Sequence, residues 1–516
     1  MNPSTNTQSI GTVYLIGAGP GDVGLLTNKG LDLLKNCDCL VYDRLIQPEM
    51  LSLAPRNCKR IYVGKAASDH AMPQEEINLL LCDLAREYQT VVRLKGGDPY
   101  VFGRGGEEGE VLRAHKVPFE VVPGISSSIG GLAYAGIPIT HRNHASSFHV
   151  FTGHFKDDSK DHDWSIVSKL EGTLVFLMSI SSIPYITAKL VENGRNKEMP
   201  VAVVSNAASP SQEVFESTLE NAMAELPIGN IKSPALLVVG DVIHMRKTLN
   251  WFEEKPLFGK KIIVTRASAQ SSRFASMLKA KGAVVEELPM IEINPLGISL
   301  DREKLQKGSQ IWFTSENGVH QFMNSLFESG LDVRALGHLK VLAIGPTTSK
   351  ILEGYGIRPD YMPSRFTQEG IIETMQPILT EDDHILIPCA KVTRPLLTDW
   401  LEAFCTYEKF AVYETVQASI QDEDLQTVKQ KVSEADYITF ASASAVDHFT
   451  QFVSNNNLTL SRKSKMAAIG PITEDALREH HHPVAISSSP HTLAAMMQAI
   501  IEDVQKEAIQ CNVSED

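Results

Sequence analysis

The sequence lacks the features that would place it in a membrane or outside the cell. Among its 516 residues, no apolar run approaches the ~20 needed to span a bilayer. The opening MNPSTNTQSI is polar and has neither the charged nor the apolar region of a signal peptide. The seven cysteines are scattered, and none forms a CxxC pair. We therefore expect reduced thiols, a cytoplasmic location and no membrane partner.

Positive charge is also scarce, since 48 lysines and arginines stand against 62 aspartates and glutamates, a formal net charge of −14. This balance disfavours nucleic acid as a partner. A polyanionic ligand would need local clusters of cations instead. No metal-binding motif is visible, because the run His480, His481 and His482 is typical of a solvated helix end. We expect no metal.

Short β-branched runs alternate with amphipathic stretches along most of the chain, which predicts an α/β protein. At ~100–200 residues per domain, the length predicts about three or four domains. Residues 1–11 are typical of a loose tail. The segment HMRKTLNWFEEKPLFGK follows a clear strand and carries mixed charge, a proline and a glycine. We interpret 247–259 within it as an interdomain linker.

The second half of the sequence repeats itself. IWFTSENGVHQF is followed by VLAIGPTTSKIL, and later YITFASASAVDHF is followed by MAAIGPITEDAL. Ser315 lies 30 positions before Gly345, and Ser442 lies 28 positions before Gly470. Two copies are too few for a solenoid, so the repetition predicts two similar α/β lobes. Chance similarity of common strand–turn–helix patterns is the alternative.

Two glycine-rich loops follow predicted strands in the first half. GAGPGD, residues 17–22, differs from the dinucleotide motif GxGxxG because Asp22 replaces the last glycine, and Pro20 removes a backbone N–H. Asp43 could pass for a ribose-binding acid, but the failed glycine pattern disfavours a dehydrogenase. The second loop lies within RLKGGDPYVFGRGGEE. Ligands of open α/β sheets bind at such strand ends, so both loops are candidate binding turns.

The ordered set GAGPGD, LVYDRL, VGK with PQEEIN, RLKGGDPYVFGRGGEE, VPGISS, AGIPITHR and TGH closely resembles the uroporphyrinogen III C-methyltransferases of the tetrapyrrole methylase family. The resemblance covers roughly Thr12 to Met245 and implies a domain at 12–246. It implies a two-lobed α/β fold that binds S-adenosylmethionine in a cleft and forms a homodimer. We expect the two glycine turns to face one another across that cleft.

The resemblance also implies roles for individual residues. Asp43 matches the family's proposed proton acceptor and Lys65 its proposed proton donor, although a salt bridge at a strand end is the plain alternative. Ala207 stands where the family usually has glycine, so only a backbone contact would survive there. The implied donor-binding residues are Pro20, Gly96, Gly97, Asp98, Val101, Ser126, Ser127, Met178 and Ala207.

The implied substrate is a macrocycle with eight carboxylates. Arginine can bind a carboxylate through two hydrogen bonds, which makes basic side chains in the motifs candidate partners. Each could equally be an ordinary surface cation. The candidates are Arg44, Arg104, His141 and Arg142.

The motifs IIVTR, FTSENGV, AIGPTT, VYET, FASASAV and AIGPIT resemble uroporphyrinogen III synthases across roughly Lys260 to Ile500. The resemblance implies a domain at 260–510 whose two lobes are joined by a pair of strands. The first lobe would comprise about 260–293 and 417–510. The second lobe, about 294–416, would be inserted between them.

The synthase resemblance implies closure of a linear hydroxymethylbilane with inversion of its last ring, which is mainly positioning work. Tyr413 of VYET aligns with a tyrosine proposed to assist departure of the hydroxyl group, although a packed strand-end ring is the alternative. Hydroxyl residues in turns and three cations are candidate partners for the substrate carboxylates. They are Ser315, Thr347, Thr348, Ser442, Thr473, Arg266, Lys391 and Arg394.

Together these resemblances predict a bifunctional enzyme that makes uroporphyrinogen III and methylates it twice to precorrin-2. The sequence does not distinguish the siroheme branch from the cobalamin branch. Two alternatives stay open. The methylase could act on a later corrin intermediate, or the second half could be a tetrapyrrole-binding sensor without catalytic activity.

Overall fold

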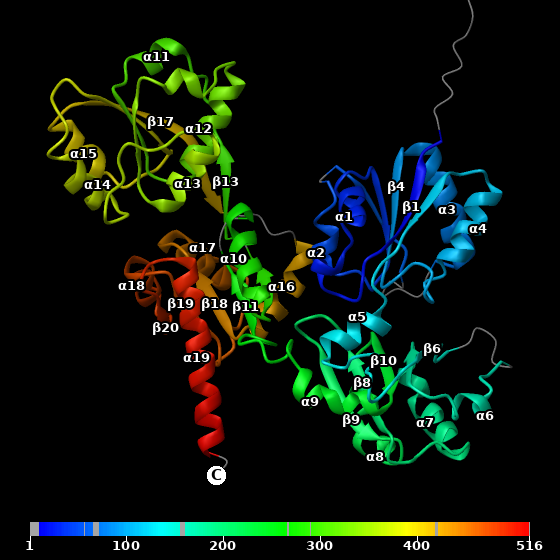
Figure 1. Cartoon of the computed structure of the whole chain (residues 1–516). Helices are drawn as coiled ribbons and strands as arrows, with labels where there is room; N and C mark the ends of the chain where they lie inside the picture. Colours follow the sequence, from blue (N-terminus) through cyan, green and yellow to red (C-terminus); the bar gives the residue numbers. More distant parts are fainter. Residues whose placement is uncertain are drawn as a thin grey trace, which may run out of the picture. The chain divides into compact units, whose positions relative to one another are not determined.

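In the described part of the chain, alternating strands and helices build four sheets of five strands each. The computed structural model describes residues 10–55, 57–64, 72–154, 160–265, 268–288, 290–417 and 422–514. The chain divides into two units, the first comprising Met1–Lys260 with Lys279–Val284 and the second comprising Lys261–Leu278 with Val285–Asp516 (Figure 1). Each unit contains two of the sheets. Among the described helices, none is long and apolar enough to cross a membrane.

The first sheet has the strand order β3-β2-β4-β1-β5, and every pair in it is parallel. The central strands β1 and β4 are almost wholly buried, as expected for parallel strands covered on both faces. Since the strands run the same way, the turns that follow them lie at one edge. The strands are β1 Thr12–Gly17, β2 Cys39–Tyr42, β3 Lys59–Tyr62, β4 Thr90–Lys95 and β5 Phe119–Val122.

Helices cover both faces of this sheet, and each face has its own apolar core. Helix α1 begins after Thr27, whose side chain accepts a hydrogen bond from Gly30 N, an ordinary N-cap. Helix α3 places Ile77 and Leu81 against the sheet. The helices are α1 Asn28–Lys35, α2 Pro48–Leu51, α3 Gln74–Glu87 and α4 Gly105–Ala114.

The second sheet has the order β6-β7-β10-β8-β9 and mixes directions. β6 is parallel to β7, whereas β10 is antiparallel to both β7 and β8. Strands β7 and β8 therefore run the same way and end at the same edge. The elements are α5 Ser127–Tyr134, β6 Phe148–Thr152, α6 Trp164–Val167, β7 Thr173–Leu177, α7 Ile183–Glu192, β8 Pro200–Ser205, β9 Glu213–Thr218, α8 Ala222–Glu225, β10 Ala235–Val239 and α9 Arg246–Leu249.

The segment 247–259, predicted as a linker, is ordered and packs on the second lobe of the first unit. The ring of Phe252 is buried and lies 4.7 Å from the ring of Tyr134 on α5. The Glu253 carboxylate accepts hydrogen bonds from Arg246 and Gln212. Apolar contacts and a partly buried ion pair thus fix the segment against the domain that precedes it.

The third sheet, in the second unit, has the order β12-β11-β18-β19-β20. Its apolar face packs on α17 and α18 through residues such as Phe440, Phe449 and Leu477. The last helix, α19, is attached through Tyr437, whose hydroxyl donates to Asp503 at 2.7 Å. The elements are β11 Lys261–Val264, α10 Ser268–Ala280, β12 Val284–Glu287, α16 Asp422–Glu434, β18 Tyr437–Phe440, α17 Ala443–Asn455, β19 Lys465–Ala468, α18 Pro471–Glu479, β20 Val484–Ser487 and α19 Leu493–Ser514.

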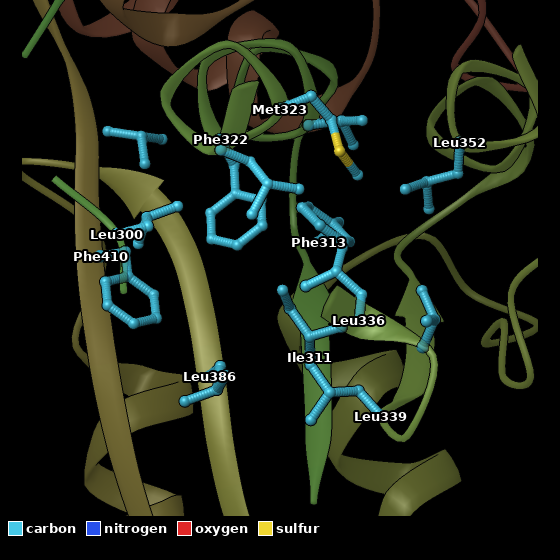
Figure 2. Close-up of a cluster of buried hydrophobic side chains, with 14 of the residues drawn as sticks. Leu300, Ile311, Phe313, Phe322, Met323, Leu336, Leu339, Leu352, Leu386 and Phe410 are labelled. Carbon is cyan, nitrogen blue, oxygen red and sulfur yellow. The ribbon is translucent and has the colours of Figure 1, made fainter. Parts of the chain in front are cut away.

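The fourth sheet has the order β13-β17-β16-β14-β15 and is inserted between β12 and β18 of the third. The predicted boundary between 293 and 294 falls inside β13. The apolar core between the fourth sheet and its helices contains Phe313, Phe322 and Leu352 (Figure 2). The elements are β13 Ile291–Pro295, α11 Arg302–Gln306, β14 Gln310–Phe313, α12 Glu316–Glu328, β15 Lys340–Ala343, α13 Pro346–Gly354, α14 Gln368–Met375, β16 His384–Ala390, α15 Leu396–Glu402 and β17 Thr406–Gln417.

The predicted repeat is present in both sheets of the second unit. Ser315 caps α12 after β14, and Ser442 caps α17 after β18, with φ and ψ of −161° and 155° in one and −162° and 156° in the other. Gly345 and Gly470 precede α13 and α18, each of which has proline at its start. Proline suits that position because its missing N–H would have no partner there.

Candidate active sites

The two glycine turns of the first sheet are bonded directly to each other. Gly19 N donates to Gly97 O at 3.1 Å, and Gly97 N donates to Gly19 O at 2.9 Å. The expectation that a cleft separates the two turns is therefore wrong for these residues. They follow the neighbouring parallel strands β1 and β4, and beyond the strand ends the two glycines form a separate antiparallel bridge. A ligand at this edge must lie beside the joined turns.

Close backbone packing explains why glycine is required here. A Cβ on Gly124 would lie 2.3 Å from Gly97 O and 2.7 Å from the backbone of Gly17. Gly97 also has φ of +67°, a conformation that L side chains rarely adopt. The turns after β1, β4 and β5 thus meet without intervening side chains.

Asp98 uses both carboxylate oxygens to shape its own loop. Oδ1 accepts from Tyr100 N at 2.8 Å, and Oδ2 accepts from Gly124 N at 3.0 Å. The side chain therefore ties the turn after β4 to the turn after β5. Val101, in the same loop, is 38% exposed and is accessible to a ligand.

Helix α5 brings further predicted donor-binding residues to the same place. The Ser126 side chain caps the helix by accepting from Ser128 N, and Ser127 is its first residue. A Cβ on Gly130 would lie 3.0 Å from the Pro20 ring, and one on Gly21 would lie 2.8 Å from Ala207 O. The turn after β1 therefore lies against α5 at Pro20 and against the turn after β8 at Gly21.

Unusual backbone conformations mark the turns after β7 and β8. Met178 has φ of 54° and its side chain is 53% exposed, while Asn206 and Ala208, on either side of Ala207, have φ of 47° and 58°. Such conformations cost free energy and cluster at functional sites. The turns that carry Pro20, Gly97, Asp98 and Ala207 contact neighbouring turns or α5, and the donor-binding role of all nine residues stays a prediction from the motif.

Asp43 follows β2 at the edge where the glycine turns meet. Its Oδ2 lies 3.3 Å from Arg93 Nη2, and its Oδ1 accepts from Leu45 N at 3.1 Å. The side chain is 26% exposed, so one side of the carboxylate remains open. A strand-end salt bridge was the plain alternative for Asp43 and Lys65. Asp43 pairs with Arg93 and still has a partly exposed carboxylate.

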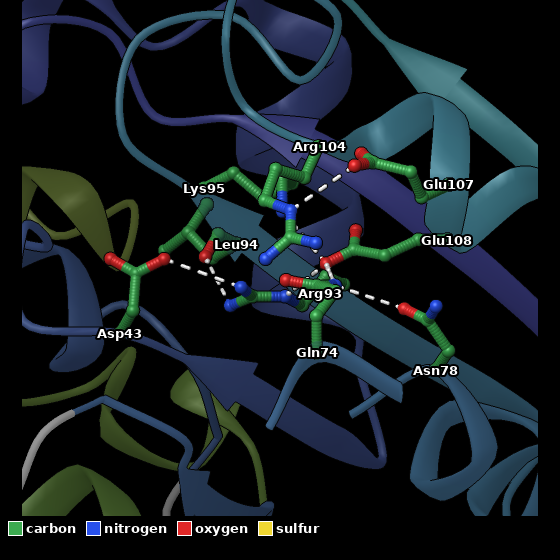
Figure 3. A network of polar contacts seen from close by, with 9 residues as sticks. All are labelled: Asp43, Gln74, Asn78, Arg93, Leu94, Lys95, Arg104, Glu107 and Glu108. Atoms are coloured by element: carbon green, nitrogen blue, oxygen red, sulfur yellow. Dashed lines mark hydrogen bonds and ion pairs between the residues drawn. The ribbon is translucent and has the colours of Figure 1, made fainter. Parts of the chain in front are cut away.

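Behind Asp43 lies a buried cluster of charges that the sequence motifs did not reveal (Figure 3). Glu108 Oε1 is 3.2 Å from Arg93 Nε and 2.7 Å from Lys95 Nζ, and Gln74 also donates to it. Burial lowers the pKa of the Lys95 ammonium, and repulsion from Arg93 lowers it further, against the attraction of Glu108. The sequence did carry one indication of this cluster, because Arg93 and Lys95 stand within the otherwise apolar strand β4.

The predicted substrate cations of the first unit do not form one group. Arg44 approaches Ser233 Oγ at 3.4 Å, and Arg104 pairs with Glu107. His141 and Arg142 precede β6, whereas Met178 follows the parallel strand β7, so the two cations lie at the opposite edge of the second sheet. There Arg142 lines a cavity of about 510 Å³. Lys65 and Arg266 lie outside the described residues.

In the second unit, Tyr413 is the centre of the predicted synthase site. Its ring is buried on β17, and its hydroxyl oxygen lies 3.2 Å from Ser315 Oγ. Burial raises the pKa of the Tyr413 phenol. The group therefore stays protonated at neutral pH and can donate a hydrogen bond. Lys391 lies beside it, because Lys391 N donates to Tyr413 O at 2.8 Å.

The other predicted synthase residues are divided between the two sheets. Lys391, just after β16, pairs with Glu414 on β17, and Arg394, before α15, pairs with Glu369 on α14; all four are exposed or half-exposed. Thr347 is in the first turn of α13 beside the buried Thr348. Ser442 caps α17 and the buried Thr473 lies in α18, both beside the third sheet. Ser315 and Lys391 are thus the predicted residues that hydrogen-bond to Tyr413 within the described part of the chain.

Comparison with known proteins matches each half of the chain to a different family model. "Tetrapyrrole (Corrin/Porphyrin) Methylases" matches residues 12–223, and "Uroporphyrinogen-III synthase HemD" matches residues 272–498. The porphyrin biosynthesis protein HemD of Ruminiclostridium josui is 35% identical over 503 residues, which are 95% of this chain and 98% of that protein. The chain belongs to this family, in which a tetrapyrrole methylase is joined to a uroporphyrinogen-III synthase.

Other relatives match only part of the chain. The uroporphyrinogen-III C-methyltransferase of Bacillus subtilis is 40% identical over 329 residues, covering 63% of this chain and 68% of that protein. The chain spans about half the length of the siroheme synthases it matches, 54% for that of Stutzerimonas stutzeri. The solved uroporphyrin-III C-methyl transferase of Thermus thermophilus, complexed with S-adenyl homocysteine, is 41% identical, with a TM-score of 0.40, and covers 45% of this chain and 99% of that one.

Proposed function

We propose that the chain carries out two consecutive reactions of tetrapyrrole biosynthesis. The second half closes hydroxymethylbilane to uroporphyrinogen III with inversion of the last ring. The first half then transfers two methyl groups from S-adenosylmethionine to this product and gives precorrin-2. The observation that carries the methylase proposal is the junction of Gly19 with Gly97 beside the accessible carboxylate of Asp43.

The edge of the first sheet fits a methyl donor with polar and apolar parts. Glycine turns present bare backbone, while the exposed side chains of Val101 and Met178 offer apolar surface to a purine. S-adenosylmethionine would supply the electrophilic methyl group. The residues proposed to bind it are Pro20, Gly96, Gly97, Asp98, Val101, Ser126, Ser127, Met178 and Ala207.

Methyl transfer to carbon requires a carbon with high electron density and a route for the proton that leaves afterwards. The pyrrole rings supply the electrons. We assign the proton to Asp43, because its carboxylate is partly open to solvent and fixed on its other side. Lys65 is the proposed proton donor, and Arg44, Arg104, His141 and Arg142 are the proposed partners of the substrate carboxylates.

For the synthase half, we propose that Tyr413 donates a hydrogen bond to the departing hydroxyl group of the bilane. Its protonated phenol and fixed position support this role. The electron-rich pyrroles then do the bond making, and the protein holds the chain so that closure with inversion of the last ring wins. The proposed substrate partners are Arg266, Ser315, Thr347, Lys391 and Ser442.

Further features of the protein are proposals of the same kind. We propose functional domains at 12–246 and 260–510 joined by 247–259, a cytoplasmic location and a homodimer formed through the methylase domain. We also propose that neither reaction uses a metal. Among the described residues, no group of three or more His, Cys, Asp or Glu could hold a metal ion.

The deciding experiment is a coupled assay with the intact chain, hydroxymethylbilane and S-adenosylmethionine. We expect precorrin-2 as the product and uroporphyrinogen III when the methyl donor is left out. If the assay yields the uninverted isomer alone, which forms chemically without an enzyme, the synthase proposal is overturned. Methylation of later corrin intermediates in preference to uroporphyrinogen III would overturn the substrate assignment of the first half.

A further inference from the structure

Arg93 is fixed by three different acceptors around its guanidinium group. Nε lies 3.2 Å from Glu108 Oε1, Nη1 donates to Leu94 O at 3.2 Å, and Nη2 lies 3.3 Å from Asp43 Oδ2. The side chain is only 4% exposed. A lysine could not satisfy this geometry, because its ammonium is a point charge without the planar fork of a guanidinium.

Glu108 is the anchor of the arrangement. Its side chain is 0% exposed, and Oε1 accepts from Arg93, Lys95 and Gln74. Its Oε2 has no hydrogen-bond partner among the described residues. A group without solvent access cannot meet a substrate at this edge. Its charge therefore acts on the two cations, and a buried carboxylate needs such partners because desolvation is costly.

Asp43 is the exposed end of the same chain of contacts. Its side chain is 26% exposed, whereas the other three charged side chains, those of Arg93, Lys95 and Glu108, are 4%, 5% and 0% exposed. The charges of two cations and two carboxylates cancel. The cluster thus links a buried, immobile carboxylate through a rigid guanidinium to an accessible carboxylate at the proposed methylation site (Figure 3).

We propose that Arg93 is a positioning residue for methyl transfer, which fixes the direction of the Asp43 carboxylate and is itself fixed by Glu108. The inference rests on the proposed role of Asp43 as proton acceptor. A carboxylate held at one oxygen by Arg93 and at the other by Leu45 N presents its remaining lone pairs in a constant direction. Displacement of a reacting group by about 1 Å can slow a reaction about 10²-fold.

The test compares Arg93→Gln with the matched control Lys95→Gln in the full chain. Each variant removes one buried cation that contacts Glu108, but of the two cations only Arg93 pairs with Asp43. Single-turnover methyl transfer to uroporphyrinogen III should fall about 10- to 100-fold in Arg93→Gln, with the Kd for S-adenosylmethionine unchanged. Lys95→Gln should keep a rate close to that of the unmodified chain. Equal slowing in both variants would overturn the proposal.

Arg93→Lys separates position from charge. It keeps the positive charge, yet it cannot reach both carboxylates, so its rate should stay closer to that of Arg93→Gln than to that of the unmodified chain. Full recovery with lysine would show that charge alone matters and would overturn the proposal. Unfolding curves identify any variant whose slow rate reflects loss of folded protein, and the rates are then compared per folded molecule.

A double-mutant cycle distinguishes failure of this inference from failure of the proposed function. If Arg93 acts through Asp43, then Arg93→Gln should cause no further slowing in the Asp43→Asn background. Independent, multiplicative losses would overturn the positioning role and leave the role of Asp43 intact. An undiminished rate in Asp43→Asn alone would instead remove the premise taken from the proposed function.

Discussion

The hydroxyl oxygen of Tyr413 lies 3.2 Å from Ser315 Oγ, while the same Ser315 oxygen accepts the backbone N–H of Gly318 at 2.9 Å. One serine therefore both begins helix α12 and contacts the buried phenol on β17. This contact fixes the phenol relative to the first turn of the helix.

Tyr413→Phe removes this hydroxyl and keeps the packed ring. We expect formation of uroporphyrinogen III to slow about 10- to 100-fold, since one hydrogen-bond donor at the reacting bond is lost. The ratio of the inverted to the uninverted isomer, measured chromatographically, should fall as chemical closure competes. Tyr407→Phe is the control, because the Tyr407 hydroxyl donates to Glu402 at the surface. An unchanged rate in Tyr413→Phe would reduce its role to packing.

Asp43→Asn replaces the accessible carboxylate with an amide of nearly the same shape. We expect methyl transfer to fall about 10²-fold, the usual contribution of a general base, with little change in binding of S-adenosylmethionine. Stopped-flow rates and calorimetric titration measure the two quantities. Asp83→Asn, at an exposed pair with Arg86 on α3, is the control. Equal losses in rate and in donor affinity would contradict the proton-acceptor role.

Gly124→Ala tests the crowded junction of the turns. The new Cβ would lie 2.3 Å from Gly97 O, so the backbone must shift, at a cost of about 1–3 kcal/mol in the free energy of unfolding. Donor affinity should fall as well, because the turns after β4 and β5 move apart. At Gly106, a new Cβ would meet none of the described residues within 4 Å, so alanine should be neutral or stabilise by up to about 1 kcal/mol. Similar effects at both positions would contradict the argument.

Acid should weaken the attachment of helix α19 through Asp503. Burial raises the pKa of this carboxyl, but hydrogen bonds from Lys465 and Tyr437 outweigh it, so the net pKa lies below the ordinary value of 3.8. A carboxyl whose pKa is lowered on folding stabilises the protein fully above its unfolded pKa and loses this effect as the pH falls through the folded pKa. Urea unfolding should therefore show Asp503→Asn destabilised at pH 7, with the difference shrinking below pH ~4. A constant difference would exclude ionisation as its cause.

The sequence predicted the strand-end turns well, because glycine requirements are local. Both glycine loops predicted from the sequence directly follow strands, one after β1 and one after β4. Direct pairing of Gly19 with Gly97 was not foreseen, since adjacency of β1 and β4 depends on strand order. The repeat of Ser315 and Ser442 was also visible, because a cap and its helix are short-range features.

Long-range charge pairing was beyond the sequence. Arg93 and Lys95 lie on a strand and Glu108 lies on a helix 13 residues after Lys95, so only the packing of α4 on the sheet brings them together. The separation of Arg142 from Met178 likewise depends on strand direction in the second sheet. The motifs indicated which residues are candidates, but they did not indicate at which edge of its sheet each residue lies.

Ser315 and Ser442 show what became of the two copies in the second unit. Their backbone angles agree within 1°, and each accepts the N–H three residues ahead, Gly318 or Ala445. Yet Ser315 also contacts a buried tyrosine, whereas Ser442 contacts the neighbouring Ser444. Replacing Ser442 should therefore loosen one helix end, while replacing Ser315 should disturb chemistry as well. The two copies therefore share one helix cap but differ in what the capping serine contacts, a buried phenol in one lobe and a neighbouring serine in the other.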